Sequence, residues 1–154
     1  MTIITASLAV YGAALGTYNF FLKRGENTVK LRVTVNVGSM ATGRQVPNPH
    51  ISLEAVNGGL RSVNLNQRFF LLDEKTKLTP DGFGGWESIP DFPCRLEPGD
   101  KIITWKDMRL VADGMGKNGY KGKVKLVGAY GDTVGNLYKS KPRVLDLNLW
   151  TTQK

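Results

Sequence analysis

The chain of 154 residues has the length of a single domain and can bury a hydrophobic core without disulfides or a metal ion. Its formal net charge of +8 indicates an anionic partner, whether nucleic acid, an acidic membrane surface or an acidic protein. One cysteine and one histidine exclude an internal disulfide and any histidine–cysteine zinc site built from this chain alone.

Residues 1–22 carry no charged side chain, and Lys23 and Arg24 follow at once. A helix of this length would be roughly 30 Å long, close to the thickness of a bilayer core. Tyr18 and Phe20 lie near the charged end, where aromatic side chains gather at a membrane interface. The pattern predicts an N-terminal membrane anchor over residues 1–24. The basic residues after it place the rest of the chain on the cytoplasmic side of an inner membrane.

Several Thr, Ser and Asn residues lower the hydropathy of this segment. An apolar helix packed inside a protein assembly, such as a virion or a filament, would therefore have a similar sequence. Gly12 and Gly16 are four residues apart and would lie on one helix face. Such a small-residue face lets two helices approach closely, so these two glycines are candidates for helix self-association.

After Gly25 the pattern changes to the period-two alternation of half-buried strands. Strands are predicted over 27–38 and 50–57, and a longer strand over 60–73 is expected to bulge near Gln67, where the alternation slips. Residues 80–93, which include "GFGGWE", are expected to be irregular.

The second half of the chain continues with short elements. A helix is predicted within 106–119, with Asp107 near its start and Gly114 or Gly116 at its end. Further strands are predicted over 101–105, 120–132, 135–141 and 143–150.

About seven short strands with regular turns predict a mainly β domain over residues 25–154, an immunoglobulin-like antiparallel β-sandwich that follows one N-terminal apolar helix. One face of each sheet would meet the core and the other would meet solvent.

Three pieces of the chain, "VNGGLRSV", "RLEPGD" and "GDTVGNLYKSK", together resemble a widespread group of uncharacterised bacterial proteins. Members of that group pair one N-terminal membrane segment with a small immunoglobulin-like sandwich. The resemblance implies structural roles in turns for Gly58 with Gly59, Pro98 with Gly99, and Asp132 with Gly135. It implies no catalytic residue, and the group has no agreed activity.

The sequence contains no P-loop, no dinucleotide-binding pattern and no nucleophile elbow. His50 is expected at a core edge or on the surface, and Cys94 is expected to be a half-buried structural thiol. The acidic residues between 73 and 91 are expected to be solvated. We therefore expect no enzyme activity, no cofactor, no metal site and no small-molecule substrate.

Two basic trios alternate along predicted strands, which places each trio on one face of its strand. If the two strands are neighbours, the trios form one patch for an anionic partner, made of Lys121, Lys123, Lys125, Lys139, Lys141 and Arg143. Lipid headgroups or nucleic-acid phosphates would suit this patch, and a solvated, edge-protecting sheet face is the simpler interpretation.

These observations favour a non-enzymatic, membrane-anchored β-sandwich that binds a partner through its soluble domain. A protein partner or self-association of the chain is expected. Two alternatives remain open. One is a structural subunit of a virion or filament, with the helix packed in the assembly. The other is a nucleic-acid or nucleotide-binding module that uses the basic strand face.

Overall fold

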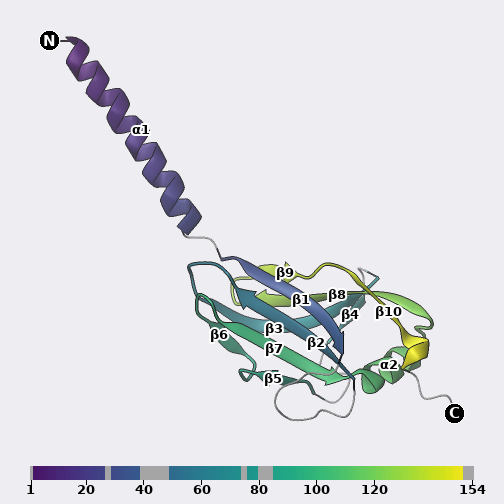
Figure 1. The fold of residues 1–154 in the computed structure, drawn as a ribbon. Coiled ribbons are helices and arrows are strands. Elements are labelled where there is room, and N and C mark those ends of the chain that lie inside the picture. Colours follow the sequence, from purple (N-terminus) through teal and green to yellow (C-terminus); the bar gives the residue numbers. More distant parts are fainter. Residues whose placement is uncertain (1, 27–28, 39–48, 74–75, 80–84, 151–154) are drawn as a thin grey trace.

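The protein consists of an N-terminal helix that projects from one end of a β-rich body (Figure 1). The structure is a computed structural model, and it describes residues 2–26, 29–38, 49–73, 76–79 and 85–150. The helix, α1, spans Thr2–Glu26. The body contains two antiparallel sheets that pack face to face around one main core.

The four-stranded sheet has the order β1-β2-β7-β5, with β1 at Leu31–Gly38, β2 at His50–Asn57, β7 at Lys101–Asp107 and β5 at Glu87–Ile89. The six-stranded sheet has the order β10-β8-β3-β4, with β10 at Arg143–Asp146, β8 at Lys123–Asp132, β3 at Val63–Leu72 and β4 at Thr76–Leu78. Two further short strands complete it, β6 at Cys94–Leu96 beside β3 and β9 at Leu137–Lys139 beside β8.

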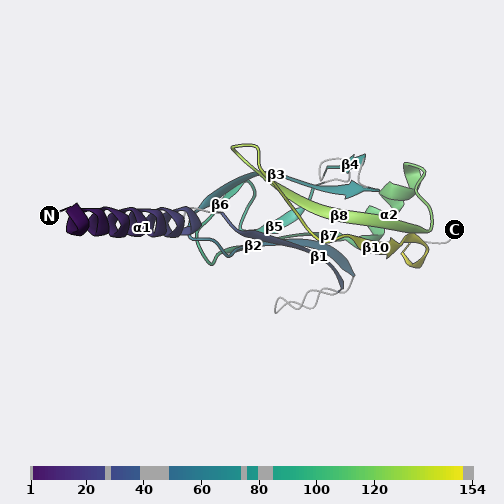
Figure 2. The same cartoon turned by 90° about the horizontal axis from the view of Figure 1, so that it is seen from above.

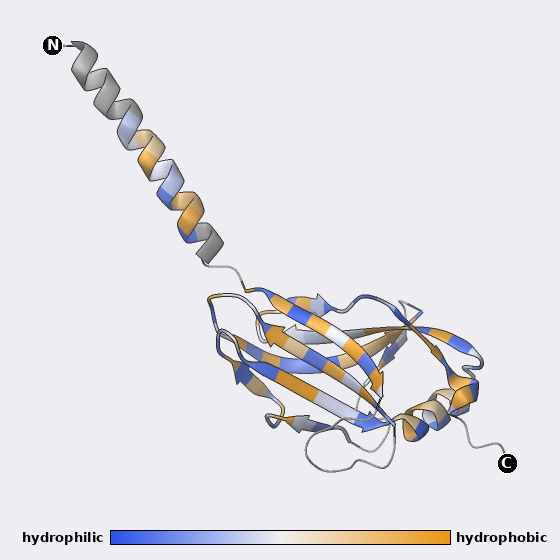
Figure 3. Cartoon of the chain, in the orientation of Figure 1, coloured by the Kyte–Doolittle hydropathy of each residue, from blue (hydrophilic) through white to orange (hydrophobic). Residues whose placement is uncertain are grey.

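Hydrophobic and polar residues alternate along the strands, as the orange and blue bands of Figure 3 show, and the inward-facing set builds the core. Val33 and Val35 of β1 face inward and are buried, whereas Arg32 and Thr34 between them are exposed. The mainly β prediction is confirmed, and so are the central strands predicted from period two.

Gly128 of β8 faces the opposite sheet and leaves no room for a side chain. A Cβ atom at this position would stand 2.2 Å from Leu53 Cδ1 and 2.6 Å from Val35 Cγ2. Both neighbours belong to the opposite sheet, so a larger residue at this position would force side chains of β1 and β2 to move.

The bulge predicted near Gln67 is confirmed, because the pairing of β3 with β8 shifts register between Leu65 and Gln67. Beyond the bulge, Phe70 belongs to the main core, whereas Phe69 and Leu71 belong to a second, smaller apolar cluster. Alternation places that second cluster on the outer face of the six-stranded sheet.

The short helix α2, Met108–Lys117, is also confirmed. Asp107 caps it, since its Oδ1 accepts a hydrogen bond of 2.8 Å from the backbone N–H of Arg109. Met108 and Met115 are among the buried residues that hold the helix on the core. α2 lies at the end of the sandwich opposite α1 (Figures 1 and 2).

Three short strands were not predicted. β4 has only three residues, and β5 and β6 lie within or next to the stretch that was expected to be irregular. The strand predicted over 143–150 is also too long. It ends at Asp146, whose side chain accepts a hydrogen bond from Asn148 N, and a 3₁₀ turn, η2, follows at Leu147–Leu149.

Every side chain of α1 between Tyr11 and Lys23 is exposed. Among the residues that the structure describes, no helix is both long enough and apolar enough to cross a membrane. The expected membrane-spanning helix is therefore without structural support. Polar Thr17 and Asn19 interrupt the apolar residues of this segment.

Candidate basic interaction face

The outer face of the six-stranded sheet carries the first group of predicted basic residues. In β8, Val124 and Leu126 face the core, so Lys123 and Lys125 face outward and are exposed. Lys139 of β9 pairs with Ala129 of β8 and lies on the same outer face. Lys121 precedes β8 and is exposed.

Arg143 lies on the other face, contrary to the prediction. It pairs with the core residue Leu126, and its Nη1 donates a hydrogen bond of 3.1 Å to the carbonyl oxygen of Val35 in β1. β9 and β10 both pair with β8, but their registers differ by one residue. A one-residue slip exchanges the two faces of a strand, so the two trios do not form a single patch.

The centre of this outer face was not predicted from the sequence. A floor of four nearly buried apolar residues lies between the lysines: Phe69, Leu71, Val127 and Ala129, which are 4%, 9%, 7% and 0% exposed. The signal was the run "FFLL" in β3, which places apolar residues on both faces of the strand.

Lys77 of β4 joins the rim of the floor because it pairs with Leu71. Its Nζ atom lies 4.8 Å from the centre of the Phe69 ring, within the range of a cation–π interaction. Lys139 borders the opposite side through its pairing with Ala129. Asp146 of β10 lies opposite Lys123 in the sheet register and brings a negative charge to the end of β8, so Lys123 is not counted with the lysines around the floor. We name the floor together with Lys77, Lys125 and Lys139 the basic outer face.

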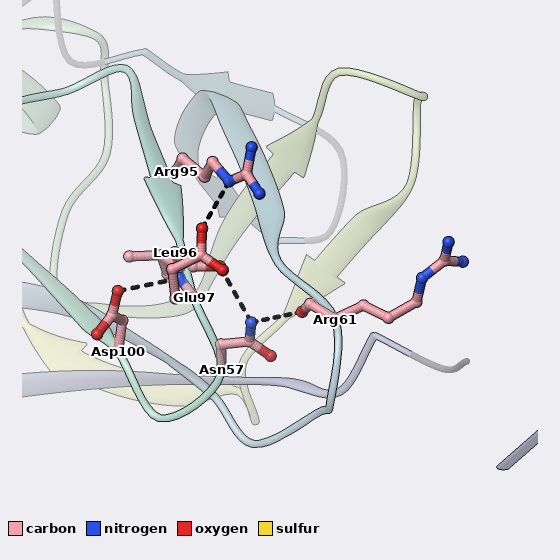
Figure 4. A network of polar contacts seen from close by, with 6 residues as sticks. All are labelled: Asn57, Arg61, Arg95, Leu96, Glu97 and Asp100. Atoms are coloured by element: carbon pink, nitrogen blue, oxygen red, sulfur yellow. Dashed lines mark hydrogen bonds and ion pairs between the residues drawn. The ribbon is translucent and has the colours of Figure 1, made fainter. Parts of the chain in front are cut away.

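The turns that carry the resemblance are joined by one buried side chain. Asn57, which is fully buried, donates hydrogen bonds from Nδ2 to the carbonyl oxygens of Arg61 and Leu96 at 2.8 and 3.1 Å (Figure 4). Its Oδ1 accepts one from Gly59 N at 3.0 Å. The "VNGGLRSV" and "RLEPGD" segments are therefore held together as one unit.

The third such segment is built around Asp132, which is only 4% exposed. Its carboxylate accepts hydrogen bonds from the backbone N–H of Val134, from the backbone and side chain of Asn136, and from Tyr138 Oη. Burial by itself raises the pKa of Asp132, but these hydrogen bonds outweigh it and hold the pKa below its ordinary value. Asn57 and Asp132 therefore stabilise the turns of these segments.

His50 and Cys94 lie at opposite ends of the sandwich. His50 pairs with Asp107 next to α2, whereas Cys94 pairs with Leu65 near the end where α1 enters. Burial raises the pKa of the Cys94 thiol, and the charge of Arg68 offsets part of this effect. The two groups cannot act as a nucleophile and its base within one chain.

Of the acidic residues considered between 73 and 91, Asp73, Glu87 and Asp91 are exposed. Glu74 and Asp81 lie outside the described residues. Trp86 from "GFGGWE" packs in the core, with its ring centre 5.0 Å from that of Phe70. Among the described residues, no group of three or more His, Cys, Asp or Glu side chains is arranged to hold a metal ion.

Gly12 and Gly16 both lie in the exposed part of α1. A Cβ atom built at either position has no neighbour within 4 Å among the described residues. The face they form is thus open to a second helix.

The sequence matches no protein-family model, and no curated protein matches it.

Proposed function

We propose that this protein is a non-enzymatic binding module in which α1 fixes the position of an immunoglobulin-like sandwich and the sandwich contacts an anionic partner. One observation carries the proposal. α1 projects from the sandwich with every described side chain exposed, from Tyr11 through Phe20 to Lys23, while the sandwich has its own core (Figure 1). Apolar side chains such as Phe20 and Phe21, at 59% and 64% exposure, need a cover from outside the chain.

The strand order supports the immunoglobulin-like assignment. Constant-type immunoglobulin domains place strands A, B, E and D in one sheet and C, F and G in the other. The order β1-β2-β7-β5 follows A-B-E-D, and β3 and β8, with β9 and β10 along the free edge of β8, follow C-F-G. β4 occupies the place of an additional strand beside C.

Two surroundings would cover α1. The uncharged segment that ends in Lys23 and Arg24 favours an inner membrane with the sandwich in the cytoplasm. The open face at Gly12 and Gly16 favours other helices, as in a filament or virion, or as a self-associating pair.

Fractionation of cells that express the full chain separates these surroundings. A membrane tether predicts that the chain floats with lipid and resists alkaline washing, and that it is released only by detergent. An assembly predicts sedimenting particles or fibres that form without lipid. A chain that stays monomeric and in solution without detergent would contradict both the membrane tether and the assembly.

A double Gly12→Ile, Gly16→Ile variant tests self-association. Loss of the oligomer in detergent with an unchanged β circular dichroism spectrum is expected, because the larger side chains prevent close helix contact. An unchanged oligomer size would exclude this face as the contact.

The basic outer face is tested with acidic liposomes and with single-stranded and duplex DNA at increasing salt. Binding should fall steeply with salt, and further in a Lys77→Glu, Lys139→Glu variant, because screening acts over roughly 8 Å at physiological ionic strength. The matched control is Lys101→Glu, Lys117→Glu, which changes the net charge equally on other exposed surfaces. Preference for DNA would favour the nucleic-acid module, and equal losses in both variants would exclude the face.

A further inference from the structure

β1 is an edge strand whose free side points into a groove. In the described part of the chain it pairs only with β2. Just before the strand, the carbonyl oxygen of Lys30 accepts a hydrogen bond from Gly58 N, on the β2 side. The carbonyl oxygen of Val35 accepts from Arg143, on the opposite side. The N–H and C=O of one residue point the same way, so Val33 and Val35 direct their backbone groups toward the free side.

Two hollows border β1 and share Arg32 and Thr34. The first has a volume of about 680 Å³ and is lined by Arg32, Val33, Thr34, Val35, Asn36, Ser140, Lys141, Pro142 and Arg143. The second has a volume of about 770 Å³ and is lined by Val29, Lys30, Leu31, Arg32, Thr34, Glu54, Val56, Gly58 and Tyr138. We name the two hollows together the β1 groove; the first follows the free side of β1, and the second also borders β2. Each hollow has the size of an ordinary ligand site.

The charges of the β1 groove are mostly positive. Arg32, Lys141 and Arg143 line the first hollow, and none of its described lining residues is acidic. The second hollow adds Lys30 and includes one carboxylate, Glu54. Such a groove favours a negatively charged occupant.

We propose that the β1 groove binds an extended acidic segment of a partner protein, which adds to the four-stranded sheet as a strand beside β1. An exposed sheet edge is a template for a further strand, and main-chain hydrogen bonds from Val33 and Val35 supply the pairing. Carboxylates on one face of the incoming strand meet Arg32 and Lys141. The guanidinium of Arg143 releases its hydrogen bond to the Val35 carbonyl oxygen and binds a carboxylate of the incoming segment instead. This site is separate from the basic outer face and does not depend on the surroundings of α1.

The test uses the full chain in a neutral detergent and a fluorescent decapeptide of alternating Glu and Val. Fluorescence anisotropy should show binding that weakens with salt, and exchange of the Val33 and Val35 amide hydrogens should slow when peptide is added. A peptide of the same sequence with every amide N-methylated keeps its charge but loses its donors, and it should bind at least about tenfold more weakly. An alternating Lys and Val peptide should not bind.

Variants locate the contact. Arg32→Glu with Lys141→Glu should weaken binding at least about tenfold at low salt, because both exposed cations line the groove. Lys117→Glu with Lys121→Glu makes the same charge change at exposed positions that line neither hollow, and binding should stay within about twofold. Equal losses in both variants, equal binding of the N-methylated peptide, or no binding at low salt would each overturn the proposal. None of these outcomes bears on fractionation or liposome binding, so the proposed function is judged separately.

Discussion

The hydroxyl of Tyr130 in β8 donates a hydrogen bond of 3.0 Å to the carbonyl oxygen of Leu53 in β2, which ties the two sheets together through the core. The same hydroxyl lies 2.9 Å from Thr104 Oγ1 in β7. Tyr130 is fully buried, and this burial raises the pKa of its phenol. The hydroxyl therefore stays protonated and available as a donor at neutral pH.

Replacing Tyr130 with Phe should lower the free energy of unfolding by about 1–3 kcal/mol, because the Leu53 carbonyl loses its buried partner. Urea denaturation followed by circular dichroism measures the change. Tyr18→Phe, on the exposed part of α1, is the matched control and should have no effect. A Tyr130→Phe variant as stable as the original chain would show that the hydroxyl does not stabilise the pairing of the sheets.

Asn57→Ala should destabilise the sandwich by about 3 kcal/mol, since two carbonyl oxygens and one N–H lose their partner inside the protein. Asn57→Asp should be at least as harmful at neutral pH, because a carboxylate would face the Arg61 and Leu96 carbonyls. Thermal unfolding measures both variants. Asn66→Ala, at an exposed position of β3, is the control. If Asn57→Ala unfolds at the same temperature as the Asn66→Ala control, the two turns are held together by other contacts.

Asp132 should make stability depend on acid pH. Its folded pKa lies below the ordinary carboxyl value, so its contribution is complete above that ordinary value, near pH 4. The contribution is lost as the pH falls through the lower, folded pKa. Urea midpoints measured between pH 7 and pH 2 should decline at the acid end, and Asp132→Asn should flatten that decline. The same decline in both proteins would assign the effect to other carboxylates.

A chain without residues 1–24 should be soluble, folded and rich in β structure. The main core contains no described residue of α1, and Val29 is its first contributor. Far-ultraviolet circular dichroism and cooperative thermal unfolding test this expectation. An unfolded product would mean that α1 belongs to the core and is not a separate tether.

Local sequence patterns were enough to predict the elements that depend on near neighbours along the chain. Period two identified the long strands from Val33 and Val35 onward, and the slip at "FFLL" located the bulge at Gln67. Asp107 marked the start of α2 because a helix cap is made with the backbone two residues away. The alternation also identified Lys123 and Lys125 as outward-facing.

Which of these elements lie side by side could not be predicted from such local patterns. The one-residue difference in register between β9 and β10 separates Arg143 from Lys139, and no local pattern records a register between distant strands. β4, β5 and β6 are each three residues long, which is too short for an alternating pattern to predict them. Lys77 belongs to the basic outer face because β4 pairs with β3. Asn57 likewise joins Arg61 to Leu96, and the second of these contacts spans 39 positions of the chain. Contacts between residues so far apart in the sequence depend on the packing of the whole sandwich, because a strand completes its backbone hydrogen bonds only with a strand that folding brings next to it.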